Sequence, residues 1–112
     1  MARNAELGEF EHLLLLAILR LRSEAYAPEV ARVLEDRAGR EMSRGTLYAA
    51  LDRLEERGLV VWELEPSSPG RSGMRRRRFE VTPDGARALA ACRQVFLNMW
   101  DGVEALFPAD QA

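Results

Sequence analysis

The pattern of hydrophobic residues changes its period at Gly58, and this change limits the folds open to the chain. Upstream of Gly58, apolar residues recur mostly at the three- and four-residue spacings of helices. Downstream, residues 59–65 (LVVWELE) are β-branched and aromatic and alternate as in a strand. Because 112 residues are too few for two ordinary domains, both patterns must share one core. The sequence therefore predicts a mainly α fold with a β-hairpin.

Two helices are expected in the first third of the chain. Residues 9–22 (EFEHLLLLAILRLR) include an apolar run, 13–19, that has no polar side. Both faces of this helix should therefore pack against other elements. A second helix should begin near Pro28, since proline favours the first helical turn, and should end at Gly39.

A third helix is expected to follow Ser43, which is a good N-cap residue. Its apolar residues, spaced four and three apart, share one face: Leu47, Leu51 and Leu54. The other face carries Arg44, Gly45, Thr46, Tyr48, Ala49, Asp52 and Arg53. The small residues at the start of this face would let the helix approach a groove closely, and Gly58 ends the segment.

The strand that follows Gly58 should pair with a second one. Residues 66–73 hold two prolines and two glycines and predict a loop, and residues 74–81 (MRRRRFEV) return as a strand. The two strands predict an antiparallel hairpin with a long tip.

Thr82 and Pro83 then open a fourth helix, expected to continue to about Phe107. We expect one compact unit: a winged helix-turn-helix in 1–82, a dimerisation helix in 83–107 and a tail in 108–112.

Positive charge is concentrated in the hairpin. The net charge of −2 argues weakly against a nucleic-acid partner, but all sixteen basic residues are arginines. Five of them fall within eight residues that contain no acid: Arg71, Arg75, Arg76, Arg77 and Arg78. Arginine suits forked contacts to phosphates and base edges. The alternatives are a solvated hairpin tip and the arginine enrichment that high-GC genomes produce.

Three helices, a basic hairpin and a last helix form the order of a winged helix-turn-helix, in which the third helix enters the major groove of DNA. The hairpin, or wing, would reach the flanking backbone or the minor groove. The predicted DNA-contacting residues are Ser43, Arg44, Gly45, Thr46, Tyr48 and Arg53 of the third helix, with Arg71, Arg75, Arg76, Arg77 and Arg78 of the wing. For the helix residues the alternative is ordinary surface, and the Tyr48 ring can pack while its hydroxyl reaches a phosphate.

The last helix carries a stripe of apolar residues that another protein surface is expected to cover. Leu89, Cys92, Phe96, Met99, Val103 and Leu106 are spaced 3, 4, 3, 4 and 3 apart, as in a heptad seam, and Trp100 and Phe107 widen it. A helix that is apolar around most of its circumference needs cover in a small protein. The sequence therefore predicts a homodimer, whose two-fold symmetry would match a palindromic operator.

Three segments together resemble the PadR family of transcriptional regulators. They are LGEFEHLLLLAILRL, SRGTLYAALDRLEERGLV, and RRRRFEVTPDG after the loop rich in proline and glycine. The resemblance covers residues 7 to about 107 and is closest to a short subgroup with a single C-terminal helix. One departure is Arg78, which stands where many members carry a tyrosine.

The resemblance implies a homodimeric DNA-binding regulator, most simply a repressor. It also offers an alternative for Phe96 and Trp100, which could line a pocket between subunits for a small, flat hydrophobic effector rather than form plain dimer core. An alternative function for the whole chain is a winged-helix protein-interaction module that does not bind DNA.

Other classes of function find little support in the sequence. An enzyme would need a nucleophile with its base, paired carboxylates or metal ligands, and no such set is visible. One histidine (His12) and one cysteine (Cys92) do not make a metal site, and no cofactor is expected. We expect His12 on the helix surface or at the interface, and Cys92 as a small hydrophobe. With no secretory signal, no apolar run long enough to span a membrane and a lone cysteine, we expect a cytoplasmic protein.

Overall fold

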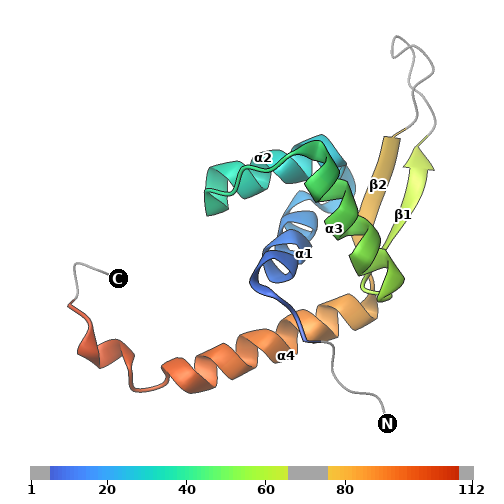
Figure 1. Cartoon of the computed structure of the whole chain (residues 1–112). Coiled ribbons are helices and arrows are strands. Elements are labelled where there is room, and N and C mark those ends of the chain that lie inside the picture. The colour runs from blue at the N-terminus through green and yellow to red at the C-terminus, as the bar shows by residue number, and fades with distance from the viewer. Residues whose placement is uncertain (1–5, 66–75, 109–112) are drawn as a thin grey trace.

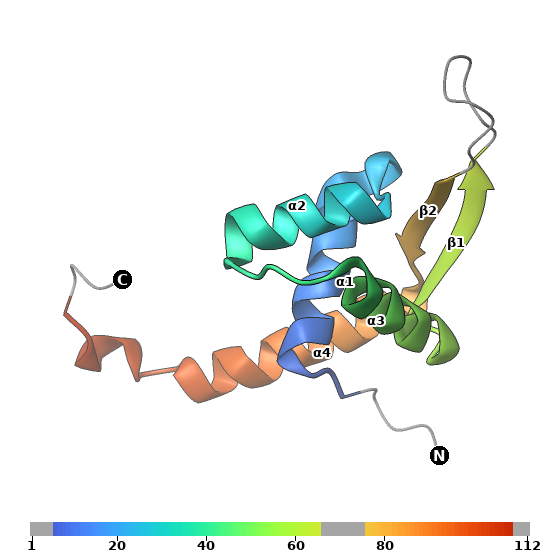
Figure 2. The ribbon, with the colours of Figure 1, turned by 45° about the horizontal axis from the view of Figure 1, so that its top comes forward.

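The computed structural model describes residues 6–65 and 76–108. Its elements follow the predicted order: α1 (Glu9–Leu21), a 3₁₀ turn η1 (Arg22–Glu24), α2 (Ala27–Ala38), α3 (Arg44–Glu56), β1 (Val60–Glu65), β2 (Arg76–Val81), α4 (Pro83–Trp100) and a 3₁₀ turn η2 (Glu104–Leu106). The first three helices gather into one cluster, the hairpin stands at its side, and α4 runs beneath it and out beyond it (Figures 1 and 2). The predicted mixed fold is confirmed.

The core lies where the first three helices, the base of the hairpin and the start of α4 meet. Its largest fully buried side chains are Leu14, Leu15, Ile18, Val30, Leu34, Leu51, Leu54, Leu59, Val60 and Phe79. The predicted inner face of α3 is confirmed, since Leu47, Leu51 and Leu54 are all buried. No helix in the described part of the chain is long and apolar enough to cross a membrane.

The helix boundaries follow local capping chemistry. The Ser43 hydroxyl accepts a hydrogen bond from the Thr46 N–H at 3.1 Å, and the Thr82 hydroxyl accepts one from the Gly85 N–H at 3.0 Å. Gly39 ends α2 in the left-handed conformation, with φ +66°. At Gly85 a Cβ atom would lie 2.3 Å from the Leu59 carbonyl oxygen, so only glycine allows α4 to start this close to the strand.

The hairpin is antiparallel and is fastened to the start of α2. Trp62 pairs with Phe79 and Glu63 with Arg78. Beyond β2, Tyr26 forms an isolated bridge with Arg78, and the Phe79 N–H donates to the Ala25 carbonyl at 2.8 Å. The wing is therefore held on one edge by the residues that precede α2.

The last helix ends earlier than its sequence pattern indicated. It stops at Trp100 rather than near Phe107, because Gly102 takes a left-handed conformation with φ +84° and the chain turns there. The Val103 N–H donates to the Trp100 carbonyl across this turn at 2.8 Å. The Phe107 ring then lies 5.5 Å from the Trp100 ring, centroid to centroid.

This turn changes the predicted seam. Val103 and Leu106 lie beyond the helix and do not continue its stripe. Leu89 is only 7 % exposed and packs in the core of its own chain. Cys92 is half-buried with its Sγ 3.3 Å from Nδ1 of His12, so it has a polar partner rather than a purely apolar setting. Phe96 and Met99 remain as the exposed part of the seam on the helix itself.

Candidate nucleic-acid interface

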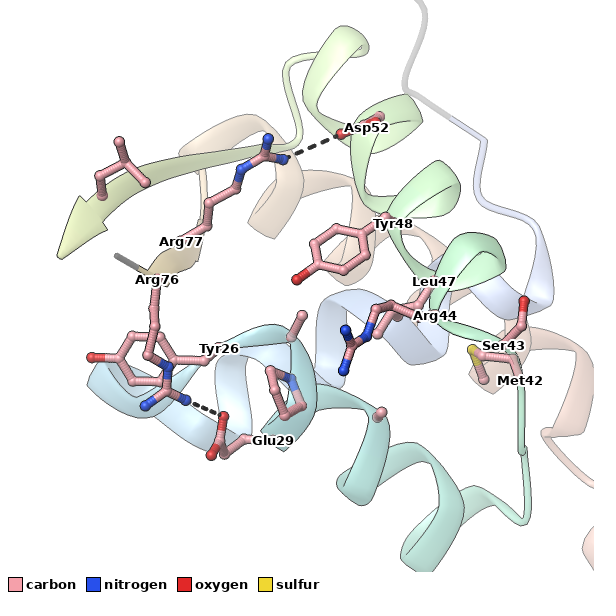
Figure 3. Close-up of a pocket in the computed structure, with 14 residues that line it drawn as sticks. Tyr26, Glu29, Met42, Ser43, Arg44, Leu47, Tyr48, Asp52, Arg76 and Arg77 are labelled. Atoms are coloured by element: carbon pink, nitrogen blue, oxygen red, sulfur yellow. Dashed lines mark hydrogen bonds and ion pairs between the residues drawn. The ribbon is translucent and has the colours of Figure 1, made fainter. Parts of the chain in front are cut away.

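A groove of about 850 Å³ opens between the start of α2, the first half of α3 and the two strands of the wing (Figure 3). From α2 and the residue before it, the lining includes Tyr26 and Glu29, and from α3 it includes Arg44, Tyr48 and Asp52. The strands contribute Leu64, Arg76 and Arg77. Residues from three separate parts of the sequence thus meet at one surface.

The predicted residues of α3 divide into two groups. Ser43, Arg44 and Tyr48 line the groove, and Figure 3 shows Arg44 and Tyr48 projecting from α3 over it. Tyr48 is half-buried because its ring also packs against the core. The remaining three are exposed on α3 but do not line the groove: Gly45, Thr46 and Arg53.

Arg76 is held at the groove by the start of α2. Its Nη2 donates to Oε1 of Glu29 at 2.9 Å, and its guanidinium carbon lies 3.9 Å from the centre of the Tyr26 ring. The Tyr26 hydroxyl donates to Oε1 of Glu65 at 3.2 Å. Burial of the Tyr26 side chain and the charge of Glu65 raise the pKa of that hydroxyl above its usual value. Tyr26 therefore stays protonated and neutral beneath the guanidinium.

Arg77 spans the gap between the wing and α3. Its guanidinium carbon lies 4.4 Å from the centre of the Trp62 ring, and its Nη1 is 3.9 Å from Oδ1 of Asp52. The indole N–H of Trp62 is buried and has no hydrogen-bond partner within residues 6–65 and 76–108. The Arg77–Asp52 pair connects the wing directly to α3, as the dashed line in Figure 3 shows.

Arg78 is paired within the hairpin itself. It contacts Glu63, its cross-strand neighbour, at 2.9 Å and Glu65 at 3.2 Å. The hydrogen bond to Glu65 raises the pKa of the Arg78 guanidinium above its usual value, and burial opposes this effect. Arg78 does not line the groove. Two further predicted wing residues, Arg71 and Arg75, lie outside the described residues.

Residues 71–78 contain no acid, which suggested that the charges of the wing arginines are not balanced, and the structure corrects this. All three described arginines of the cluster pair with carboxylates from elsewhere in the chain: Glu29, Asp52, Glu63 and Glu65. Neighbours along the chain do not indicate these partners, and Tyr26 and Glu29 are not among the residues predicted from the sequence. The register of the hairpin could have pointed to Glu63, but nothing local connects Arg76 to a residue 47 positions away.

A second exposed surface lies on the outer half of α4. Large apolar side chains gather there: Val95, Phe96, Leu97, Met99 and Trp100, followed by Leu106 and Phe107. Phe96 is 57 % exposed and Met99 73 % exposed. Both belong to the C-terminal half of α4, the helix that extends past the three-helix cluster in Figures 1 and 2. Within the described ranges, no group of three or more His, Cys, Asp or Glu residues is placed to hold a metal ion.

The family model described as "Transcriptional regulator PadR-like family" matches residues 15–91. The chain belongs to the PadR-like family. The match runs from α1 through the wing to the middle of α4 and includes every element that lines the groove. The resemblance noted in the three sequence segments is thereby confirmed.

Solved structures of PadR-like proteins share this architecture. The chain is similar to a PadR-like transcription factor from Bacteroides fragilis, with 25% identity over 88% of this chain and 89% of that chain, and a TM-score of 0.68. A PadR family regulator from Eggerthella lenta has 27% identity, coverages of 90% and 88%, and a TM-score of 0.65. One from Clostridium difficile has 26% identity, coverages of 87% and 93%, and a TM-score of 0.62. No curated protein sequence matches the chain.

Membership of the PadR-like family identifies the chain as a transcriptional regulator with a winged-helix fold. In this fold α3 corresponds to the recognition helix and the β1–β2 hairpin to the wing. The groove described above lies between these two elements and the start of α2.

Proposed function

We propose that this PadR-like protein binds duplex DNA sequence-specifically as a homodimer and represses transcription. The observation that carries the proposal is the groove between α2, α3 and the wing, where Arg44, Arg76 and Arg77 approach one surface from two separate elements. Guanidinium groups bind both phosphates and the guanine edge in the major groove. A surface of this kind fits a nucleic acid better than an apolar protein partner.

Within this proposal the two elements have different tasks. The first turn of α3 presents Arg44 beside the small residues Gly45 and Thr46, so the backbone can approach base edges closely. Arg76 and Arg77 of the wing line the groove (Figure 3), and we propose that they contact the sugar–phosphate backbone. Base contacts from α3 would select the sequence, and wing contacts would add affinity for any sequence.

The exposed apolar end of α4 supports the homodimer. Phe96, Met99 and Trp100 are too large and too close together to be left in water without cost. A second copy of the same helix covers them by symmetry and sets two recognition helices at a fixed spacing. We propose that the operator is correspondingly palindromic.

Repression and its release follow from the same assembly. We propose that the bound dimer blocks access to the promoter and that a small, flat hydrophobic effector releases it. The Trp100–Phe107 ring pair, tilted by 43°, gives such an effector an aromatic surface next to the dimer seam.

A binding titration at two salt concentrations tests the proposal against a protein-only function. Fluorescence anisotropy with a labelled duplex should show affinity falling by at least tenfold between about 50 and 200 mM salt, because each neutralised phosphate contributes about 0.9 to the log–log slope. A winged-helix module that docks only on proteins would bind the duplex weakly or with no steep salt dependence. That result would reject DNA binding.

A further inference from the structure

Arg76 does not reach the groove as an unoccupied cation. Its guanidinium is hydrogen-bonded to Glu29 and stacked on Tyr26, at 2.9 and 3.9 Å. The Arg76 and Glu29 side chains are only 26 and 32 % exposed, so water screens their attraction less than at an open surface. Figure 3 shows this pair at the edge of the groove, on the side formed by the start of α2.

A carboxylate and a phosphate make the same kind of contact with a guanidinium group. Both present oxygen acceptors that match the planar fork of N–H donors. A phosphate that approaches Arg76 must therefore share or displace the Glu29 carboxylate. Glu29 itself lines the groove, so it also meets any polyanion that enters there.

We propose that Glu29 is an internal competitor of DNA phosphates for Arg76 and limits the affinity of the protein for every duplex. The inference rests on the proposed DNA-binding function. Tyr26 acts as a positioning residue, because its neutral ring supports the guanidinium whether the fork faces Glu29 or a phosphate. The start of α2 thus becomes a third element of the interface, beside α3 and the wing.

Two other roles for Glu29 predict different results. A carboxylate that merely repels DNA would weaken binding whether or not Arg76 is present. A carboxylate that presents Arg76 to DNA in a productive orientation would strengthen binding. A double-mutant cycle between the two positions separates these roles from competition.

The test uses the full chain and a labelled duplex of arbitrary sequence, with anisotropy measured at several salt concentrations. The variants are Glu29→Gln, Arg76→Gln and the double substitution. The matched control is Asp36→Asn, which removes one negative charge from the same helix. Asp36 is exposed, does not line the groove and forms no ion pair within the described residues. Thermal unfolding without DNA checks that all variants are folded.

Competition predicts that Glu29→Gln tightens binding by about two- to fivefold. This range corresponds to the free energy that a partly exposed ion pair contributes. In the Arg76→Gln background the same substitution should change affinity no more than Asp36→Asn does. Equal tightening in both backgrounds would show simple repulsion, and weaker binding by Glu29→Gln would show that Glu29 presents Arg76. Either result overturns the proposal.

The same titration separates the failure of this inference from the failure of the proposed function. If the unaltered protein binds the duplex with a steep salt dependence and Glu29→Gln behaves like Asp36→Asn, only the competition is rejected. If the unaltered protein does not bind duplex DNA, the proposed function fails and the competition fails with it.

Discussion

At the scale of single residues, different residues at the start of α3 cap the helix and face the groove. Ser43 and Thr46 are joined by two hydrogen bonds of 3.0 and 3.1 Å, so their hydroxyl groups are used to cap the helix. Arg44, between them, is exposed, lines the groove and forms no ion pair within the described residues. Among the residues of this turn, Arg44 is therefore the one we expect to contact a base edge.

Replacing Arg44 with alanine should change the preferred operator more than it changes affinity for arbitrary DNA. A good forked contact to guanine contributes about 1–3 kcal/mol of discrimination at one base pair. Selection from a random duplex pool should therefore lose the preference at one position of each half-site. Arg37→Ala, at an exposed position of α2 outside the groove, is the control. The same motif from the protein and the Arg44 variant would contradict the assignment.

At the scale of elements, β2 has a backbone partner on each of its two edges at the base of the wing. β1 covers one edge of β2, and Tyr26 covers the other through its bridge to Arg78. The arginines of β2 therefore start from defined positions next to α2 and α3. This limits the entropy lost when they bind a phosphate.

The double variant Arg76→Gln, Arg77→Gln should weaken binding to all duplexes alike. If both side chains contact phosphates, the log–log salt slope should fall by about 1.8, since each contact contributes about 0.9. The control pair Arg37→Gln, Arg93→Gln removes the same charge from exposed positions outside the groove. An unchanged slope in the wing variant would show that these two residues do not contact DNA.

The helical cluster is also tied together by charge, and this contact predicts a pH dependence. Arg57, at the end of α3, donates to Glu11 of α1 at 2.6 Å. Burial opposes ionisation of Glu11, but the hydrogen bonds from Arg57 and the Gly8 N–H outweigh it and lower the pKa of the carboxyl below 4.5. Because the folded-state pKa is lowered, the stabilisation is present above 4.5 and is lost as the pH falls through the folded-state value.

Replacing Glu11 with glutamine should lower the free energy of unfolding by about 1 kcal/mol at pH 7. The difference from the unaltered protein should shrink as the pH falls below 4.5, where Glu11 itself becomes protonated. Urea unfolding across this range measures it. Glu9→Gln in the same turn should cost less, because its pair with Arg40 is more exposed. A difference that stays constant with pH would exclude ionisation of Glu11 as the cause.

At the scale of the whole molecule, α4 contributes to two groups of apolar residues, one in the core and one exposed at its C-terminal end. Its first turns belong to the core through Ala88 and Leu89, and its last turns carry Phe96 and Met99 into solvent. The family match ends at residue 91, close to the point where these two halves meet. The inner half of α4 therefore packs in the core of its own chain, and the outer half is the exposed surface that we propose a second copy covers.

The double variant Phe96→Glu, Met99→Glu should be a folded monomer with weak operator binding. Acids at these exposed positions place charges in the proposed seam but do not touch the core. Sedimentation and circular dichroism measure assembly and folding separately. Gln94→Glu with Asn98→Glu adds the same charge on the opposite side of the helix and should remain dimeric. A dimeric seam variant, or an unaltered protein that is monomeric at micromolar concentration, would reject the α4 interface.

Local interactions between neighbouring residues were sufficient to predict the helices and strands and the residues at which the helices begin. Ser43 and Thr82 cap helices because their hydroxyls reach an N–H three residues on, an interaction that depends on nearest neighbours alone. The end of α4 was also a local matter, since Gly102 follows Trp100 closely. The heptad spacing there predicts a helix to about Phe107, but Gly102 turns the chain and the helix ends at Trp100.

Only the tertiary structure decided which charged residues form ion pairs and which apolar residues are buried in the core of their own chain. Arg76 and Glu29 are 47 residues apart and become partners because the bridge at Tyr26 places β2 beside the start of α2. Leu89 looks like a seam residue in the sequence, yet it is buried because α4 begins against Leu59 at Gly85. Spacing along a helix tells which residues share a face. What that face packs against depends on contacts that form only when distant segments fold together.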